Sequence, residues 1–71
     1  KKGLKELAIE QYRKAIERRP NDPTFHKHLA QVYQDNGDKA KALQSYEQAL
    51  KLGGSNYRDA EMVKSEIAKL R

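Results

Sequence analysis

Apolar residues recur three and four positions apart along the whole chain, separated by polar residues. This spacing places each apolar set on one face of an amphipathic helix. The pattern predicts four helices, over residues 4–19, 23–36, 38–52 and 56–70. Their apolar stripes are Leu4, Leu7, Ala8, Ile9, Tyr12, Ala15 and Ile16; Phe25, Leu29, Val32 and Tyr33; Ala42, Leu43, Tyr46, Ala49, Leu50 and Leu52; and Ala60, Val63, Ile67 and Leu70. The sequence therefore predicts an all-α protein.

Residues that stop or start helices separate the four segments. Pro20 ends the first, because proline lacks an amide donor and disfavours a helical conformation at the residue before it. Asp22 is a good N-cap, and Pro23 fits the first position of the second helix. Glycines that can adopt the left-handed conformation suit the later helix ends. The remaining expected boundaries are Asn36-Gly37 and Gly53-Gly54 at the C-termini, Asp38 as the third N-cap, and Ser55 or Asn56 as the fourth.

The pattern repeats with a period of 34 residues. A shift by this period places the first helix on the third and the second on the fourth. The matched pairs are Gly3/Gly37, Lys5/Lys39, Ala8/Ala42, Ile9/Leu43, Tyr12/Tyr46, Ala15/Ala49, Ile16/Leu50, Leu29/Val63 and Tyr33/Ile67. A fixed period of this length indicates a stacked-repeat architecture, in which each unit buries its apolar face against its neighbours.

Residues 23–56 resemble one tetratricopeptide repeat. The positions that carry the resemblance are Leu29, Ala30, Tyr33, Gly37, Ala42, Tyr46 and Ala49. Residues 1–22 resemble the second helix of a preceding repeat, through Gly3, Ala8, Tyr12, Ala15 and Pro20, and residues 57–71 resemble the first helix of a following one. The chain departs from the family pattern at His26, where a large apolar residue is usual, and at Gly54, where proline is usual. Both departures suit a terminal repeat.

The resemblance implies a single domain over residues 1–71, an α-solenoid of antiparallel helix pairs in a right-handed superhelix. In this family the first helix of each repeat lines a concave groove that holds a partner peptide or helix. The groove positions carried over are Thr24, Lys27, His28, Gln31, Asp35, Arg58, Glu61, Met62 and Ser65. Some members hold a C-terminal carboxylate with a clamp of Lys, Asn and Arg. Lys27 and Arg58 resemble parts of it, but Gln31 and Met62 replace expected asparagines, so we do not expect a clamp.

The two ends of the array differ. Lys64 matches Ala30, where a small residue admits the partner helix, so the fourth helix is expected to be a cap with nothing packed on it. The first helix has no such cap, and we expect the chain to be the C-terminal part of a longer array. Its partly uncovered stripe predicts self-association, most simply as a two-fold pair. The residues expected in that contact are Leu7, Ala8, Ile9, Tyr12 and Ile16.

The positive net charge of the chain raises the question of a negatively charged partner. The chain has 15 Lys and Arg against 10 Asp and Glu, and four of the five excess positive charges lie in the first 20 residues. Such a segment can favour nucleic acid or an anionic surface. However, no aromatic residue interleaves these bases for stacking, and pairs such as Glu10/Lys14 and Arg13/Glu17 are typical of an ordinary helix surface. A nucleic-acid partner is therefore not expected.

Candidate chemistry is sparse. There is no cysteine, and His26 and His28, two positions apart on a helix, point away from each other, so no metal site or cofactor is expected. No serine or threonine has a histidine and an acid spaced for catalysis, and no run of 18 apolar residues could cross a membrane. The sequence thus predicts a non-enzymatic scaffold that binds a protein or peptide. The alternatives are a self-assembly module and a basic module contacting RNA or an anionic surface.

Overall fold

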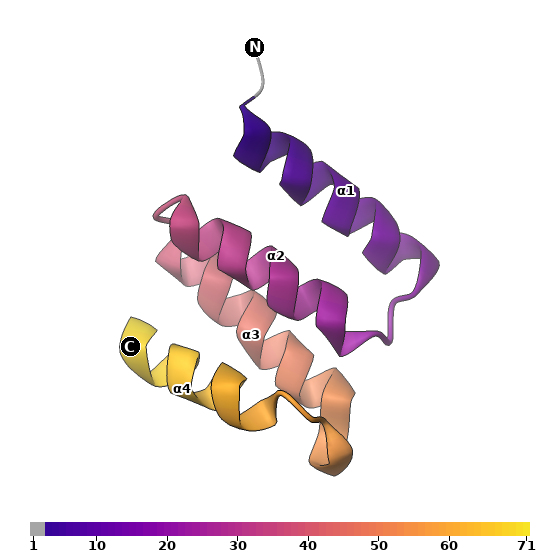
Figure 1. The fold of residues 1–71 in the computed structure, drawn as a ribbon, viewed down its shortest axis with the longest axis vertical. Helices are drawn as coiled ribbons and strands as arrows, with labels where there is room; N and C mark the ends of the chain where they lie inside the picture. Colours follow the sequence, from indigo (N-terminus) through magenta and orange to yellow (C-terminus); the bar gives the residue numbers. More distant parts are fainter. Residues whose placement is uncertain (1–2) are drawn as a thin grey trace.

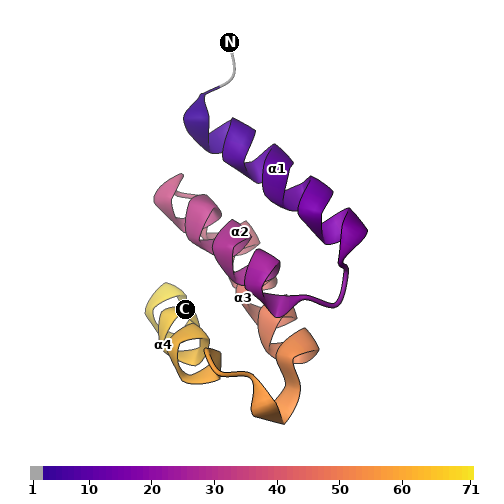
Figure 2. The same cartoon turned by 45° about the vertical axis from the view of Figure 1, so that its right-hand side comes forward.

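Four α-helices form the protein, and each packs against the next along the chain. The computed structural model describes residues 3–71, apart from the side chain of Ser55; Lys1 and Lys2 lie outside it. The elements are α1 (Leu4–Arg18), α2 (Pro23–Asp35), α3 (Lys39–Gly53), a 3-10 turn η1 (Gly54–Asn56) and α4 (Ala60–Leu70). Figures 1 and 2 both place α1 and α4 at opposite ends of the row. Residues 3–71 contain no strand, and the all-α prediction is confirmed.

The ends of α2 follow the sequence prediction closely. The Asp22 carboxylate accepts a hydrogen bond from the Thr24 amide at 3.0 Å, and Pro23 occupies the first turn. At the other end Gly37 has a φ of 82°, which favours glycine. The Asp38 amide donates to the Tyr33 carbonyl at 2.8 Å and the Gly37 amide to the Gln34 carbonyl at 3.1 Å. These two bonds form a Schellman motif, which turns the chain directly into α3.

The connection from α3 to α4 is longer than the sequence predicts, because α4 begins at Ala60. Gly54 has a φ of 67° and opens η1, after which Tyr57 is extended. The Tyr57 ring packs so closely over Gly53 that a Cβ atom there would overlap it. The predicted caps differ as well. Asp38 occupies the N-cap of α3 without a capping side-chain hydrogen bond, Asn56 ends η1 instead of capping α4, and the Ser55 side chain lies outside the described residues.

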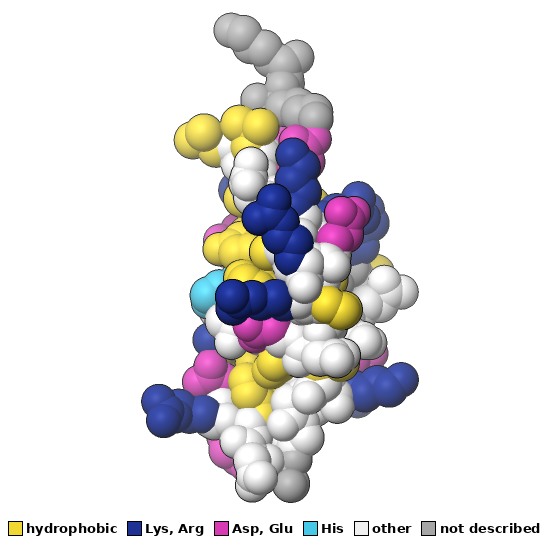
Figure 3. Space-filling model, turned by 90° about the vertical axis from the view of Figure 1, so that its right-hand side faces the viewer, with side chains coloured by type: hydrophobic (Ala, Val, Ile, Leu, Met, Phe, Trp, Pro, Cys, Tyr) yellow, Lys and Arg dark blue, Asp and Glu magenta, His cyan; other side chains and the backbone are white. Residues whose placement is uncertain are grey.

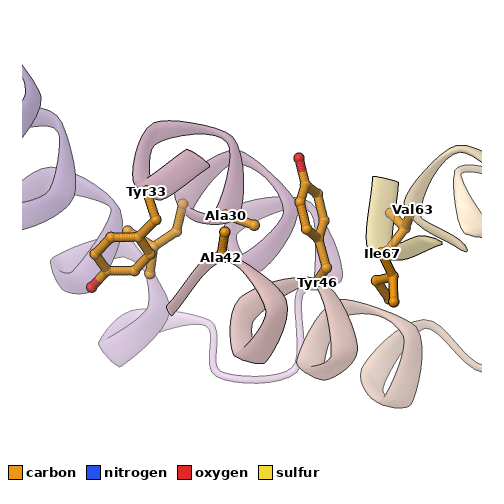
Figure 4. Packing of buried hydrophobic residues seen from close by; sticks show 7 residues of the cluster. Ala30, Tyr33, Ala42, Tyr46, Val63 and Ile67 are labelled. Atoms are coloured by element: carbon orange, nitrogen blue, oxygen red, sulfur yellow. The ribbon is translucent and has the colours of Figure 1, made fainter. Parts of the chain in front are cut away.

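The core lies where α2, α3 and α4 meet (Figure 4). Ala30 and Ala42 have no exposed surface, and their small side chains let α2 and α3 approach closely. The Tyr46 ring lies between this contact and the apolar side chains of α4, as Figure 4 shows. The prediction that Ala42 and Ala49 are buried is confirmed, whereas the burial of Ser45 was not predicted. The buried cluster consists of Leu29, Ala30, Tyr33, Ala42, Tyr46, Val63 and Ile67.

Helix α1 contributes no buried residue. Ile9, Tyr12 and Ile16 are only half-buried where they pack against the core. The Lys5 ammonium adds a hydrogen bond of 2.8 Å to the Asp35 carbonyl at the end of α2. Leu4, by contrast, is 87% exposed. The first helix therefore lies on α2 along a narrow contact, and most of its surface faces solvent.

Candidate functional site

The predicted groove residues lie on α2, on α4 and in the turn before α4, and we call this set the α2–α4 face. Most of its members are exposed to solvent, and the remaining two are half-buried. The exposed members are Thr24, Gln31, Asp35, Arg58, Glu61, Met62 and Ser65, and the half-buried ones are Lys27 and His28. Two side-chain bridges hold the two helices of this face next to each other.

The first bridge is an ion pair between the start of α2 and the start of α4. The Lys27 ammonium lies 2.7 Å from the Asp59 carboxylate, and the Lys27 side chain is only 14% exposed. The hydrogen bond from Lys27 holds the pKa of the Asp59 carboxyl below its usual value. Because its ammonium is committed to Asp59, Lys27 positions α4 and is not free for the carboxylate clamp that it resembles.

The second bridge is a chain of hydrogen bonds through Gln34. Its side-chain oxygen accepts a hydrogen bond from the Tyr46 hydroxyl at 2.9 Å, and its amide nitrogen donates to the Glu66 carboxylate at 3.2 Å. Lys69 donates to the other oxygen of Glu66 at 3.2 Å. One glutamine therefore joins α3, α2 and α4, and both polar ends of its amide are used.

The surroundings of this network keep its groups in the protonation states that it needs. Burial raises the pKa of Tyr46 to about 12, with the negative charges of Glu66 and Asp35 acting in the same direction. Hydrogen bonds from Lys69 and Gln34 lower the pKa of Glu66. At neutral pH the tyrosine is therefore a hydrogen-bond donor and the glutamate an acceptor. The Gln34 amide accepts from one and donates to the other, which fixes its orientation.

The two bridges frame the centre of the α2–α4 face. Lys27 and Gln34 are seven residues apart on α2, and Asp59 and Glu66 are seven residues apart at α4, so each pair spans about two turns. Gln31 falls between the bridges on α2, and Met62 falls between them on α4. Both are exposed, Met62 by 36%. The arrangement presents an amide and a flexible apolar side chain to solvent between two fixed points.

The two histidines lie where α2 meets its neighbours: His28 beside α1, and His26 at a hollow that residues of α1, α2 and α3 line. The His28 ring lies 5.7 Å from the Tyr12 ring, centroid to centroid, at a tilt of 57°, and so covers the contact between α1 and α2. His26 is half-buried, as the sequence predicts for a residue that replaces an apolar side chain. Burial lowers the pKa of His26, and the charge of Asp22 opposes this. Both rings therefore have packing roles in the structure.

Sequence reasoning missed the residues that join the helices of this face. Gln34, Asp59 and Glu66 were not among the predicted groove positions. Their signal in the sequence is a spacing of 32 residues, since both Lys27/Asp59 and Gln34/Glu66 pair a polar residue with an acid at that separation. Tyr57 was also missed. Its hydroxyl is buried without a hydrogen-bond partner among the described residues, and burial raises its pKa, as do the nearby charges of Asp59 and Asp22.

A hollow of about 630 Å³ lies beside α4, on the side towards α3. The Arg71 guanidinium and the Glu47 carboxylate form an ion pair at 2.7 Å at its edge. Lys64, whose place in the sequence predicts that no further helix packs on α4, is exposed at the same hollow. Its residues are Glu47, Leu50, Lys64, Ile67, Ala68 and Arg71.

The residues predicted for self-association do not form one open patch. Ile9, Tyr12 and Ile16 pack against the core, and Ala8 is half-buried. Leu7 is 44% exposed, and Leu4, which was not predicted, is the more exposed of the two leucines. The open apolar surface of α1 is thus concentrated in its first turns.

The described residues offer neither a cluster of metal ligands nor a membrane-spanning helix. Histidine, aspartate and glutamate side chains do not gather there in any group of three that could hold a metal ion. None of the helices described is both long enough and apolar enough to cross a membrane. The exposed side chains of the α2–α4 face are polar or charged, apart from Met62.

Comparison with protein families agrees with the geometry. The model for the TPR repeat matches residues 1–37, and that for the tetratricopeptide repeat matches residues 23–56. No curated protein and no solved structure matched the chain. Repeats of this kind are in general modules for protein–protein interaction. The first match covers more than half of the chain, and the helices pack in the order and with the repeat register that the family requires, so the chain belongs to the tetratricopeptide repeat family.

Proposed function

We propose that the chain is a protein-interaction module that holds a peptide or helix of a partner protein against the α2–α4 face. The observation that carries the proposal is the pair of bridges, Lys27–Asp59 and Gln34–Glu66, which fix two helices side by side. A surface that is already fixed loses little conformational entropy when it binds, which favours affinity. Gln31 and Met62, exposed between the bridges, supply a hydrogen-bonding amide and an adaptable apolar contact.

The composition of the face favours a peptide over a small molecule. Its exposed side chains are polar or charged, with Met62 as the exposed apolar exception. Small-molecule sites are concave and mostly apolar. Extended peptides and helices, by contrast, are recognised through side chains spread along a scaffold. Acids and bases both occur here, in Asp35, Glu61 and Arg58, so the partner segment should carry charges of both signs.

The test begins by selecting a probe. A phage-displayed library of random peptides is panned on the folded chain, and the selected peptide is titrated while backbone amide signals are followed by NMR. We expect the signals of Gln31, His28, Arg58 and Met62 to move together at one dissociation constant. Movement confined to Arg13, Lys14 and Arg18 would instead place the binding site on α1.

A matched pair of variants sharpens this test. Gln31→Ala removes a central amide of the α2–α4 face, whereas Gln44→Ala removes an exposed amide from α3. We expect the first to weaken the selected peptide about fivefold or more, since a lost hydrogen bond at an interface contributes on the order of 1 kcal/mol. The second should leave binding unchanged, and equal losses from both would contradict the proposal.

A second candidate function, self-association through α1, is supported by the exposure of Leu4 and Leu7 in its first turns. Exposed apolar residues that are neighbours on one helix tend to find a partner surface. The two-fold pair is the simplest arrangement, because identical patches then face each other. Half-buried Ala8, Ile9, Tyr12 and Ile16 would border the contact and would not form its centre.

Sedimentation equilibrium over a range of concentrations tests this candidate. Leu7→Glu should shift a self-associating chain towards monomer. Met62→Glu, a similar change at a comparably exposed residue of α4, should not. A chain that stays monomeric up to millimolar concentration, with the α1 amides still protected from hydrogen exchange, would exclude self-association through this helix.

A further inference from the structure

A second hollow, of about 340 Å³, lies in the angle between the end of α1 and the start of α2. It lies away from the α2–α4 face, and we call it the basic hollow. Figure 3 faces this end of the helices and shows Lys and Arg side chains clustered beside hydrophobic surface in its upper half. Its residues are Gln11, Lys14, Ala15, Arg18, Arg19 and Phe25.

Local geometry explains why three cations converge here. Gln11, Lys14, Ala15 and Arg18 follow one another at spacings of three, one and three, and therefore share one face of α1. Arg19 ends α1 and turns the chain, and its amide still donates to the Ala15 carbonyl at 2.9 Å. This turn brings Phe25, in the first turns of α2, against the same face. Half-buried Ala15 and Phe25 form an apolar floor beneath the three cations.

The charges that line the basic hollow favour an anionic ligand. No acidic residue lines it. None of the ion pairs found among residues 3–71 involves Lys14, Arg18 or Arg19. The three exposed side chains carry like charges around one hollow and therefore repel one another, although Glu10 and Glu17 lie within one turn of Lys14 on α1. A bound carboxylate would relieve that repulsion, and arginine offers it a bidentate hydrogen-bonding edge.

The repeat register shows that the fold does not require these charges. One period later, the positions of Gln11, Lys14, Ala15 and Arg18 are held by Ser45, Gln48, Ala49 and Leu52, none of which is charged. Ser45 and Ala49 are buried, whereas Gln11 is exposed and Ala15 half-buried. These four positions thus carry no charge and include two buried residues in one repeat, whereas in the other they include two cations and no buried residue. The cations at the basic hollow are specific to the first repeat.

We propose that the basic hollow is a second binding site, which takes an acidic peptide segment whose carboxylates flank an apolar side chain. The carboxylates pair with Lys14, Arg18 and Arg19, and the apolar side chain rests on Ala15 and Phe25. A nucleic-acid strand fits less well, because the cations surround one small hollow and do not form a track.

The test uses the whole chain and a fluorescein-labelled peptide of four glutamates around one leucine, with fluorescence anisotropy as the readout. A peptide with glutamines in place of the glutamates is the matched ligand control. We expect the glutamine peptide to bind at least tenfold more weakly, and the glutamate peptide to lose affinity as sodium chloride is raised.

Variants on two faces of α1 locate the site. Arg18→Gln should weaken the glutamate peptide about tenfold, because a hydrogen bond to a charged group is lost. Lys14→Gln should weaken it similarly, and the double variant more than either. Arg13→Gln removes the same charge from the other side of the helix, where Arg13 lines a different hollow, and should leave affinity within about twofold. All three residues are exposed, so thermal melting should confirm that every variant is folded.

Three results would overturn the proposal. One is an equal effect of Arg13→Gln and Arg18→Gln, which would mean that only the net charge matters. Another is equal binding of the two peptides. The last is binding of a labelled uridine homopolymer without binding of the glutamate peptide, which would make the hollow a nucleic-acid contact. Because the α2–α4 face uses other residues, the peptide selected for that face should bind Arg18→Gln normally. The two proposals can therefore fail separately.

Discussion

Helices α1 and α3 occupy the same position in successive repeats, yet they differ in how deeply the structure buries them. Ala42, Tyr46 and Ala49 of α3 have no exposed surface, while their equivalents on α1 remain half-buried. The residue types are identical, so hydrophobicity does not cause the difference. Helix α3 packs against both α2 and α4, whereas the main contact of α1 is with α2. In a linear stack, burial is set by the number of neighbours.

The comparison predicts that truncating equivalent side chains of α1 and α3 lowers the free energy of unfolding by unequal amounts. This is the largest expected effect. Tyr46→Ala should destabilise the chain by about 3–5 kcal/mol, the usual range for emptying a large aromatic site. For a domain of this size that loss approaches the whole stability. Tyr12→Ala removes a half-buried ring and should cost about 1–2 kcal/mol. Urea denaturation followed by circular dichroism measures both, and equal costs would show that α1 is as firmly packed as α3.

Overpacking gives the next largest difference. Ala42→Leu should cost about 1–3 kcal/mol, because Ala42 has no exposed surface and lies beside Ala30 in the contact of α2 with α3 (Figure 4). Ala8→Leu, at the equivalent position of α1, should change stability by less than about 0.5 kcal/mol, since it has room to point into solvent. Chemical denaturation again provides the measurement. If Ala42→Leu is as stable as the parent chain, the repeat register assigned to these residues is wrong.

A smaller effect should come from the hydrogen bonds of Gln34. Gln34→Ala leaves the Tyr46 hydroxyl without its acceptor and should cost about 1–2 kcal/mol. Tyr46→Phe removes the hydroxyl, and in that background the loss of Gln34 should matter less, with a coupling of about 0.5–1.5 kcal/mol. A double-mutant cycle of unfolding free energies tests this. Strict additivity of the two substitutions would mean that the bond contributes nothing to stability.

The last effect does not show at neutral pH and appears only in alkaline solution. Tyr46 has a pKa of about 12 in the folded chain, above the value of 10.0 for a free tyrosine. The folded state therefore holds its proton more tightly than the unfolded state. Its contribution to stability is complete below pH 10 and decreases as the pH rises from there to about 12. Thermal melting across this range should show a shallower decline for Tyr46→Phe than for the parent chain, and an unchanged decline would contradict this role.

Much of the fold was predictable because the repeat imposes it locally. Helix ends at Asp22, Pro23 and Gly37 followed from the residue types, since each position needs a particular backbone or hydrogen-bonding property. The core alanines followed from the period of 34 residues. The start of α4 did not follow, because the packing of Tyr57 over Gly53 delays it, and that contact is tertiary.

The candidate site was predictable in outline only. The family resemblance names positions on a face but does not say which side chains already have partners within the chain. Lys27 has Asp59, for example, and this became visible only once the two helices were placed side by side. The three cations of the basic hollow were visible in the sequence as an excess of charge. Their convergence depends on the turn at Arg19, which brings Phe25 against α1.

Because the two bridges are seven residues apart on both sides, α4 can be aligned along α2 in very few ways. Sliding α4 by one turn would bring Met62 or Val63, or in the other direction Ser55 or Asn56, opposite Lys27, and neither bridge could form. On the helix face of Asp59, the next acid that could align with Lys27 is Glu66, seven residues along, a displacement of about 10 Å at 1.5 Å per residue. That step would expose Val63 and Ile67, which are now buried. Helix α4 can therefore keep this alignment or separate from α2, but it cannot shift along α2 by a single turn.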